Sequence, residues 1–220
     1  MATKSRKPAQ RTAFTLAGLE EAANNRLAQL LQERLVALTD LSLVLKHVHW
    51  NVVGPHFIAV HEMLDPQVDA ARAMVDETAE RMAAMGGSPN GNAGALVATR
   101  SWDDYDIMRA GTQEHLAALD VVYTGLLADH RAAMEEAGEL DPVTEDLFIN
   151  QVGQLEQFHW FVRAHLETLD GSLITEGETT ERGAASRARG NGAGTTALSA
   201  SRAASSSRSG TRSTAARAKK

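Results

Sequence analysis

The chain has 220 residues, a formal net charge of −6 and no cysteine. The absence of cysteine excludes disulfides, zinc–thiolate sites and thiol nucleophiles. No apolar run approaches the roughly 18 residues of a transmembrane helix, and the basic start of the chain lacks the apolar stretch of a secretory signal, so we expect a cytoplasmic protein.

The charges are distributed unevenly along the chain. Residues 1–13 carry four basic side chains and no acidic one, and residues 182–220 carry nine basic side chains and no acidic one. The part between them therefore has a net charge near −19. From about residue 177 the sequence is too poor in apolar residues to fold. We expect a flexible basic arm at 1–13, a folded body at 14–176 and a disordered basic tail at 177–220.

The first half of the body predicts two long helices. Leucines at three- and four-residue steps indicate a helix through Leu27 to Val52, which the Gly54-Pro55 pair ends. A second helix is expected from about Phe57 to Met85, where the loop GGSPNGNAG follows.

The second half predicts a short helix around Trp102–Met108 and two more long helices. The third long helix runs from about Thr112 to Ala137, and Pro142 suits the first turn of a fourth, which ends near Gly171. Four long helices with one long connection between the second and third predict an all-α four-helix bundle with a crossover.

The stretch LKHVHWNVVGPHFIAVHEMLD places four of the chain's eight histidines close together. His49 lies four residues after Leu45, on the apolar stripe of the first helix, whereas His47 lies off that stripe. His56 follows the helix-breaking Pro55 and is expected in a turn. We therefore expect structural or surface roles for His47 and His56.

Potential metal ligands share one face of the second helix. His61 and Asp65 are four residues apart, as are Asp76 and Glu80, and the four fall within an arc of roughly 100°. Because buried carboxylates are costly unless they are paired or bound to a metal, this face favours a metal site. Solvated acids are the alternative, because further acids lie near the edge of the same arc.

The length of the second helix limits how these ligands can be used. His61 and Asp76 are about 22 Å apart along a helix that rises 1.5 Å per residue, so they cannot bind one ion within one chain. Either the helix carries two weak half-sites, or a two-fold partner brings its second pair to the first. Histidine and carboxylate ligands without thiolate suit iron, manganese or zinc.

Four motifs together resemble those of one known family. They are KHVHWNVVGPHFIAVHEMLD, DETAERM, the later WDDY and QFHWFVRAHLE, and they are similar to the Dps proteins, the DNA-binding proteins from starved cells, within the ferritin-like superfamily. The resemblance spans about residues 20–175. It implies a ferritin-like bundle with a short helix in the crossover, and its assembly into a hollow homododecameric shell. The basic tail is similar to that of some actinobacterial members.

The resemblance also implies a ferroxidase site with two iron ions at each two-fold interface. The ligands carried over by position are His49, His61 and Asp65 from one subunit and Asp76 and Glu80 from its mate. Hydrogen peroxide or, more slowly, oxygen would oxidise Fe(II) there, and the ferric product would be stored inside the shell. Trp50 resembles the family tryptophan that absorbs stray oxidising equivalents, with helix packing as the alternative role.

The last helix carries two further groups of potential ligands. Glu156 and His159 form an ExxH pattern, which other ferritin-like proteins use inside the bundle, but the second helix lacks the matching ExxH and we expect no such site. Asp141, Glu145 and Asp146 cluster at the start of the helix, where family acids line a three-fold pore. Complementing the helix dipole is the alternative role of these acids.

The basic arms predict non-specific, salt-dependent binding to DNA phosphates, strengthened by twelve copies on one shell. The candidate residues are Arg182, Arg187, Arg189, Arg202, Arg208, Arg212, Arg217, Lys219 and Lys220 in the tail and Lys4, Arg6 and Lys7 in the N-terminal arm. We therefore predict an iron-storing ferroxidase, associated with the nucleoid, that protects DNA. The alternatives are a mini-ferritin that does not bind DNA and an architectural nucleoid protein with a structural metal site.

Overall fold

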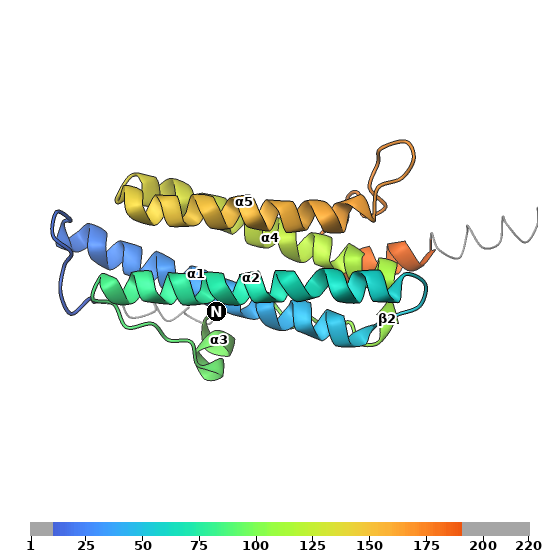
Figure 1. Cartoon of the computed structure of the whole chain (residues 1–220), viewed down its shortest axis with the longest axis horizontal. Coiled ribbons are helices and arrows are strands. Elements are labelled where there is room, and N and C mark those ends of the chain that lie inside the picture. Colours follow the sequence, from blue (N-terminus) through green and yellow to red (C-terminus); the bar gives the residue numbers. More distant parts are fainter. Residues whose placement is uncertain (1–10, 191–220) are drawn as a thin grey trace, which may run out of the picture.

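The computed structural model describes residues 11–190, which form the all-α bundle expected from the sequence. Its helices are α1 (Glu21–Asn51), α2 (Phe57–Ala84), the short α3 (Ala93–Thr99), α4 (Thr112–Gly138) and α5 (Pro142–Ala164). α1 packs mainly on α2 and α4 mainly on α5, so two helical hairpins make the bundle and the crossover with α3 joins them (Figure 1). Within the described part of the chain, no helix is long and apolar enough to cross a membrane.

The core forms because each long helix turns one apolar stripe inward. Its fully buried side chains include Leu38 and Leu45 of α1, Leu64 of α2 and Leu155 of α5. Burying a side chain of this size stabilises the fold by roughly 1.5–3 kcal/mol. A second buried cluster, around Phe148, closes the end of the bundle away from the α1–α2 turn.

A tight turn joins α1 to α2 and holds the two helix ends that carry predicted ligands. Val52–Val53 (β1) pairs in parallel with Ala110–Gly111 (β2), so the turn is fastened to the start of α4. Gly54 and His56 both have positive φ, 94° and 63°, which lets the chain reverse before α2 begins. The sequence pattern does not predict these two short strands.

The crossover differs from the expectation. Its short helix is α3, and the prediction of a helix around 102–108 is wrong, because no helix lies there. Trp102 instead donates its indole N–H to Asp40 of α1 over 2.5 Å, and Arg100 lies 3.4 Å from the same carboxylate. These contacts tie the segment to α1 without a helix.

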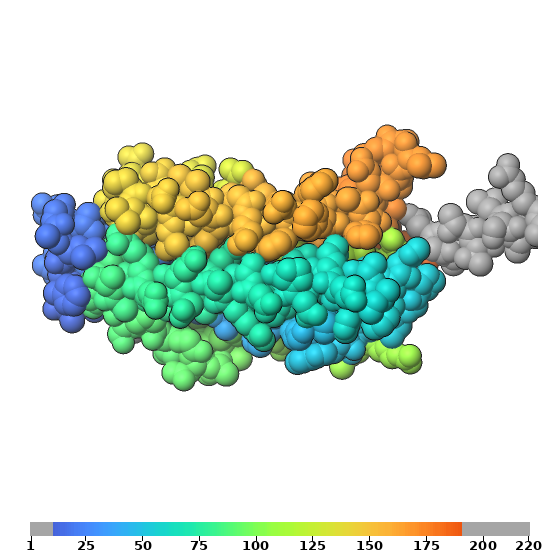
Figure 2. All heavy atoms as spheres, in the orientation of Figure 1, coloured from blue at the N-terminus to red at the C-terminus, as the bar shows by residue number. Residues whose placement is uncertain are grey.

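The chain stays with the bundle beyond α5. This helix ends at Ala164, earlier than the expected Gly171, and the segment that follows projects from the end of the bundle (Figure 2, orange). Residues 181–190 then form a further helix with buried alanines, next to α4 (Figure 1, red). The prediction of a disordered tail is therefore wrong for residues 177–190.

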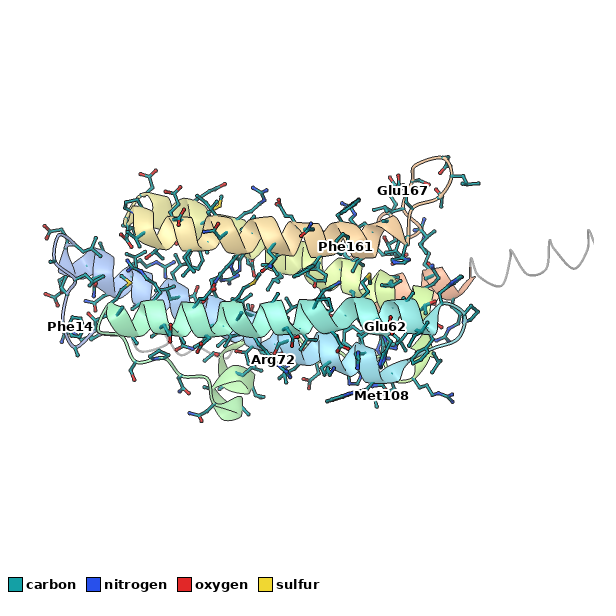
Figure 3. The ribbon with its side chains drawn as sticks, viewed as in Figure 1. Phe14, Glu62, Arg72, Met108, Phe161 and Glu167 are labelled. Atoms are coloured by element: carbon teal, nitrogen blue, oxygen red, sulfur yellow. The ribbon has the colours of Figure 1, made fainter. Side chains whose placement is uncertain are left out.

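The N-terminal segment is fastened to the opposite end of the bundle (Figure 3). Asn24 of α1 donates its side-chain N–H groups to the main-chain oxygens of Phe14 and Met85, at 3.2 and 2.9 Å. Gly86 comes so close that a Cβ atom there would lie 2.7 Å from the Phe14 carbonyl oxygen. The main-chain N–H of Thr12 also donates to Oδ1 of Asn25 at 2.8 Å, so the folded body begins slightly before residue 14.

Candidate metal centre

Two histidines from neighbouring helices hold each other at the α1–α2 turn. The rings of His49 in α1 and His61 in α2 stack with centroids 3.6 Å apart. Nδ1 of His49 lies 3.0 Å from the main-chain oxygen of His61, and Nδ1 of His61 lies 2.9 Å from the main-chain oxygen of His49. Because a carbonyl oxygen only accepts, each Nδ1 carries the proton and each Nε2 keeps a lone pair for a metal ion.

Asp65 adds a carboxylate one helical turn after His61. Its Oδ1 lies 3.4 Å from Nδ1 of His49 and 2.6 Å from Nζ of Lys46. The hydrogen bond from Lys46 is the main reason that the pKa of Asp65 is lowered, and the charge of Lys46 adds to it. Asp65 therefore stays ionised, which is the form that binds a metal ion.

Lys46 is a member of this group that the sequence reasoning missed. It lies three residues before His49, so both side chains project from the same face of α1. That spacing, read together with a carboxylate on the next helix, is the signal that could have found it. Lys46 therefore holds the carboxylate that a metal ion at this place would have to bind.

Asp76 and Glu80 lie on the same helix as His61 but far from it. α2 runs through all three positions without a break, so Asp76 lies about 22 Å along the axis from His61. In Figure 3, Glu62, the residue after His61, is labelled near the end of α2 that meets the α1–α2 turn, and Arg72 is labelled farther along the helix. Asp76 and Glu80 are both exposed on the single chain.

One chain does not complete a metal site by itself. Within residues 11–190, no three His, Asp or Glu side chains gather closely enough to hold a metal ion. The donor chemistry nevertheless suits iron, because two imidazoles and one carboxylate lie at one place and two exposed carboxylates at the other. A two-fold partner with an antiparallel α2 would join these half-sets twice. The predicted ligands therefore require a second copy of the chain to act together.

Three other residues of the turn have distinct surroundings. Trp50 follows His49 directly and is 71% exposed, so it packs against nothing in the core of its own chain. Nε2 of His47 lies 2.9 Å from the main-chain oxygen of Ile107. His56 precedes α2 with its positive φ. His47 thus has a structural contact, whereas the side chain of His56 is exposed in the turn.

The ExxH pattern of α5 does not bring its two side chains to one site. Glu156 pairs with Arg131 of α4. Nε2 of His159 lies 2.7 Å from Oδ1 of Asp120, which is also on α4. The two residues therefore have different partners on α4.

Asp141 caps α5. Its carboxylate accepts from the main-chain N–H of Thr144 at 3.0 Å and lies 2.5 Å from the Arg81 guanidinium. Burial alone would raise the pKa of Asp141, but the hydrogen bonds from Thr144 and Arg81 outweigh burial and lower this pKa. Asp141 is therefore a buried cap, and the pore prediction now rests on the half-buried Glu145 and the exposed Asp146.

Three of the predicted DNA-binding arginines lie in the helix of residues 181–190, and each is paired with an acid of its own chain. The pairs are Arg182–Asp106, Arg187–Glu178 and Arg189–Glu114. The other candidates lie outside the described residues: Arg202, Arg208, Arg212, Arg217, Lys219, Lys220, Lys4, Arg6 and Lys7.

Comparisons with known proteins agree with this fold. The sequence matches the ferritin-like domain family over residues 28–172. It is 53% identical over 178 residues to the DNA protection during starvation protein of Mycolicibacterium smegmatis, covering 81% of this chain and 97% of that protein. The solved structure of DpsA14 from Streptomyces coelicolor is 61% identical, with a TM-score of 0.74 over 75% of this chain and 98% of that chain.

A differently named relative is also similar. The fine tangled pili major subunit of Haemophilus ducreyi is 50% identical to this chain over 159 residues, which cover 72% of this chain and 84% of that protein. The solved structures of high identity are nevertheless Dps proteins, and the matched region covers α2, α4, α5 and all of α1 after its first seven residues. The chain therefore belongs to the Dps family of ferritin-like proteins.

Proposed function

We propose that this Dps-type protein oxidises Fe(II) with hydrogen peroxide at sites shared between two subunits, stores ferric mineral inside a twelve-subunit shell and binds DNA at the nucleoid. The observation that carries the proposal is the reciprocal His49–His61 pair. Neither Nε2 has a hydrogen-bond partner among the described residues, and the Asp65 carboxylate lies alongside. The exposed carboxylates of a second copy would complete the site.

The chemistry needs two iron ions together. Each Fe(II) loses one electron, and hydrogen peroxide takes up two electrons as its O–O bond breaks to give two hydroxide ions. Two neighbouring Fe(II) ions supply both electrons, so no hydroxyl radical is released. In this site the Nδ1–H···O=C bonds fix the orientation of both imidazoles, and the carboxylates offset the positive charge that grows as iron is oxidised. Trp50, next to His49, would reduce stray oxidant.

Subunit complementation tests the shared site. His61→Ala removes a ligand of one half-site and Glu80→Ala removes a ligand of the other, so each variant alone should assemble and oxidise Fe(II) slowly. In a mixed dimer, one of the two interface sites has both native halves. Random pairing of equal amounts makes half of the dimers mixed, so mixing during reassembly should restore about a quarter of the native activity.

Both the rate and the products are informative. Anaerobic Fe(II) oxidation with added peroxide should consume about two Fe(II) per peroxide with little hydroxyl radical in the native protein. Slow oxidation by both variants without recovery on mixing would contradict a site shared in this way. Native rates in both variants would contradict the assignment of the site to these residues, whereas a native protein that takes up no iron would favour the architectural protein with a structural metal site.

We assign DNA binding to the basic residues beyond Gly190, because the folded body is acidic. Deletion of residues 191–220 should strongly weaken retardation of DNA at low salt and leave Fe(II) oxidation unchanged. Binding by the native protein should fall steeply with salt concentration. A native protein that does not retard DNA at low salt would instead be a mini-ferritin without DNA binding.

A further inference from the structure

The helix of residues 181–190 is docked on the folded body by small buried side chains. Ala184 and Ala188 are 0% and 2% exposed and belong to the main core cluster, and Ala185 is 6% exposed. Alanines bury little apolar area, so this docking surface stabilises the attachment of the helix much less than a stripe of leucines would. The contact is therefore weak enough for neighbouring charges to control.

Ion pairs and one buried hydrogen bond complete the attachment. Arg182 pairs with Asp106 of the crossover, and Arg189 lies 2.5 Å from Glu114 of α4. The side chains of both arginines are exposed, 78% and 74%, so salt screens these pairs. Just before the helix, Thr175 donates to Asp120 over 2.8 Å. The arginines of the docked helix are thus neutralised by acids of their own chain.

Glu181 opposes this docking when it is ionised. It is half-buried and close to three carboxylates, Asp106 and Asp103 of the crossover and Asp40 of α1. Burial and these neighbouring charges raise the pKa of Glu181 to about 7. Tyr105, whose phenol Glu181 also influences, carries no charge because burial raises its pKa far above neutral.

The nearby cations already have other partners. Arg182 of the same helix pairs with Asp106, and Arg100 pairs with Asp40 and Asp104. These pairs reduce the repulsion that Glu181 experiences but leave it without a described ion pair of its own. Docking the helix with an ionised Glu181 therefore buries a negative charge among other negative charges.

We infer that residues 177–190 form a latch that closes when Glu181 holds a proton and opens when Glu181 loses it, and that opening transfers Arg182, Arg187 and Arg189 from their own carboxylates to DNA phosphates. The second half of this inference rests on the proposed DNA binding. The first half, the opening of the latch, does not depend on DNA.

The direction of the pH dependence follows from proton binding. The docked latch holds the Glu181 proton up to about pH 7, whereas the released segment holds it only to the ordinary pKa of 4.5. Docking is therefore favoured at low pH and weakens between about pH 4.5 and 7, by up to about tenfold per pH unit. Above pH 7 no further weakening is expected.

Hydrogen exchange of the assembled full-length protein tests the latch. Opening of the amides of residues 181–190, corrected for intrinsic exchange rates, should be at least about tenfold more frequent at pH 7.5 than at pH 5.5. Glu181→Gln should remove this pH dependence, and the exposed control Glu176→Gln should keep it. Equal opening at both pH values, or a Glu181→Gln protein that behaves like the native one, would overturn the latch.

DNA retardation at the same two pH values tests the transfer of arginines. The native protein should bind more tightly at pH 7.5, against the general trend that loss of protons weakens binding to DNA, and Glu181→Gln should lack this gain. If the exchange experiment succeeds and the native protein gains no affinity, the transfer of arginines is wrong. If neither protein retards DNA, the proposed DNA binding fails and the exchange result alone decides the latch.

Discussion

Nζ of Lys46 lies 2.6 Å from Oδ1 of Asp65, where a metal ion would have to bind that carboxylate. The ammonium is partly buried, and no other lysine lies among the described residues, so α1 supplies this charge specifically at the candidate site. An ion pair in this place weakens the carboxylate as a ligand, because the incoming cation must displace or tolerate the lysine.

Lys46→Met should therefore tighten Fe(II) binding several-fold, because it removes both the competing hydrogen bond and the repulsion between two cations. The measurement is an anaerobic calorimetric titration of the assembled protein with Fe(II). Arg131→Met, which removes a positive charge from the other hairpin, is the control and should leave the affinity unchanged. An unchanged affinity in Lys46→Met would mean that the ammonium moves aside without cost.

The Tyr123–Gln67 pair tests the buried polar part of the bundle. The Tyr123 hydroxyl donates to Oε1 of Gln67 over 2.7 Å, and both side chains are almost fully buried. Tyr123→Phe should lower the stability by roughly 1–3 kcal/mol, because Oε1 loses its donor without gaining water. Thermal unfolding of the assembled protein at one fixed protein concentration measures the loss.

A double variant separates the hydrogen bond from packing. Tyr123→Phe with Gln67→Met removes both polar partners, so it should lose less stability than the sum of the two single variants. Strictly additive losses would show that the hydrogen bond contributes nothing beyond shape.

Variants of Asp141 and Asp146 test which acids at the start of α5 serve the entry of iron. Asp141→Ala should lower stability by roughly 1–2 kcal/mol through loss of the helix cap and leave iron entry unchanged. Asp146→Asn should have little effect on stability and should slow the formation of ferric mineral from external Fe(II). If Asp141→Ala slows mineral formation while the shell stays intact, the cap residue also serves the pore.

The sequence predicted the long helices well, since their leucine stripes are regular and their ends carry Gly-Pro or Pro signals. It placed the short helix wrongly, because the side chains of Trp102 and Arg100 bind Asp40 of α1, and no local pattern reveals such a contact. It missed the helix of residues 181–190 for a different reason. The buried side chains of that helix are all alanines. Alanines at helical spacing in a stretch rich in Ser and Arg look like part of a disordered tail.

The candidate site could be predicted only in part. The sequence pattern and the family resemblance together selected His49, His61 and Asp65. The structure makes them neighbours, with the two rings stacked and Asp65 3.4 Å from His49, but it does not gather them around one point. Lys46 escaped notice because its role depends on the approach of α2, which residue spacing within α1 does not show. The contribution of Asp76 and Glu80 depends on a second subunit, and the structure of one chain does not test it.

His130 links the bundle interior to acid stability. Its Nε2 lies 2.9 Å from Oε1 of Gln151, and its ring is fully buried. Burial is the main cause that lowers the pKa of His130 to about 4, and the nearby Arg34 charge adds to it. The unfolded chain, with a pKa near 6.5, therefore binds a proton that the folded chain refuses.

The contribution of neutral His130 to the free energy of unfolding is fully present above pH 6.5. It is lost as the pH falls toward 4, by up to about 1.4 kcal/mol per pH unit. His130→Gln does not titrate and should flatten this loss, measured as the midpoint of thermal unfolding between pH 7.5 and 4.5. The exposed His165→Gln is the control and should follow the native curve. Both belong in a Glu181→Gln background, because Glu181 has the opposite pH dependence. If the unfolding midpoint of His130→Gln falls between pH 7.5 and 4.5 as much as that of the protein with native His130, the acid sensitivity belongs to other groups.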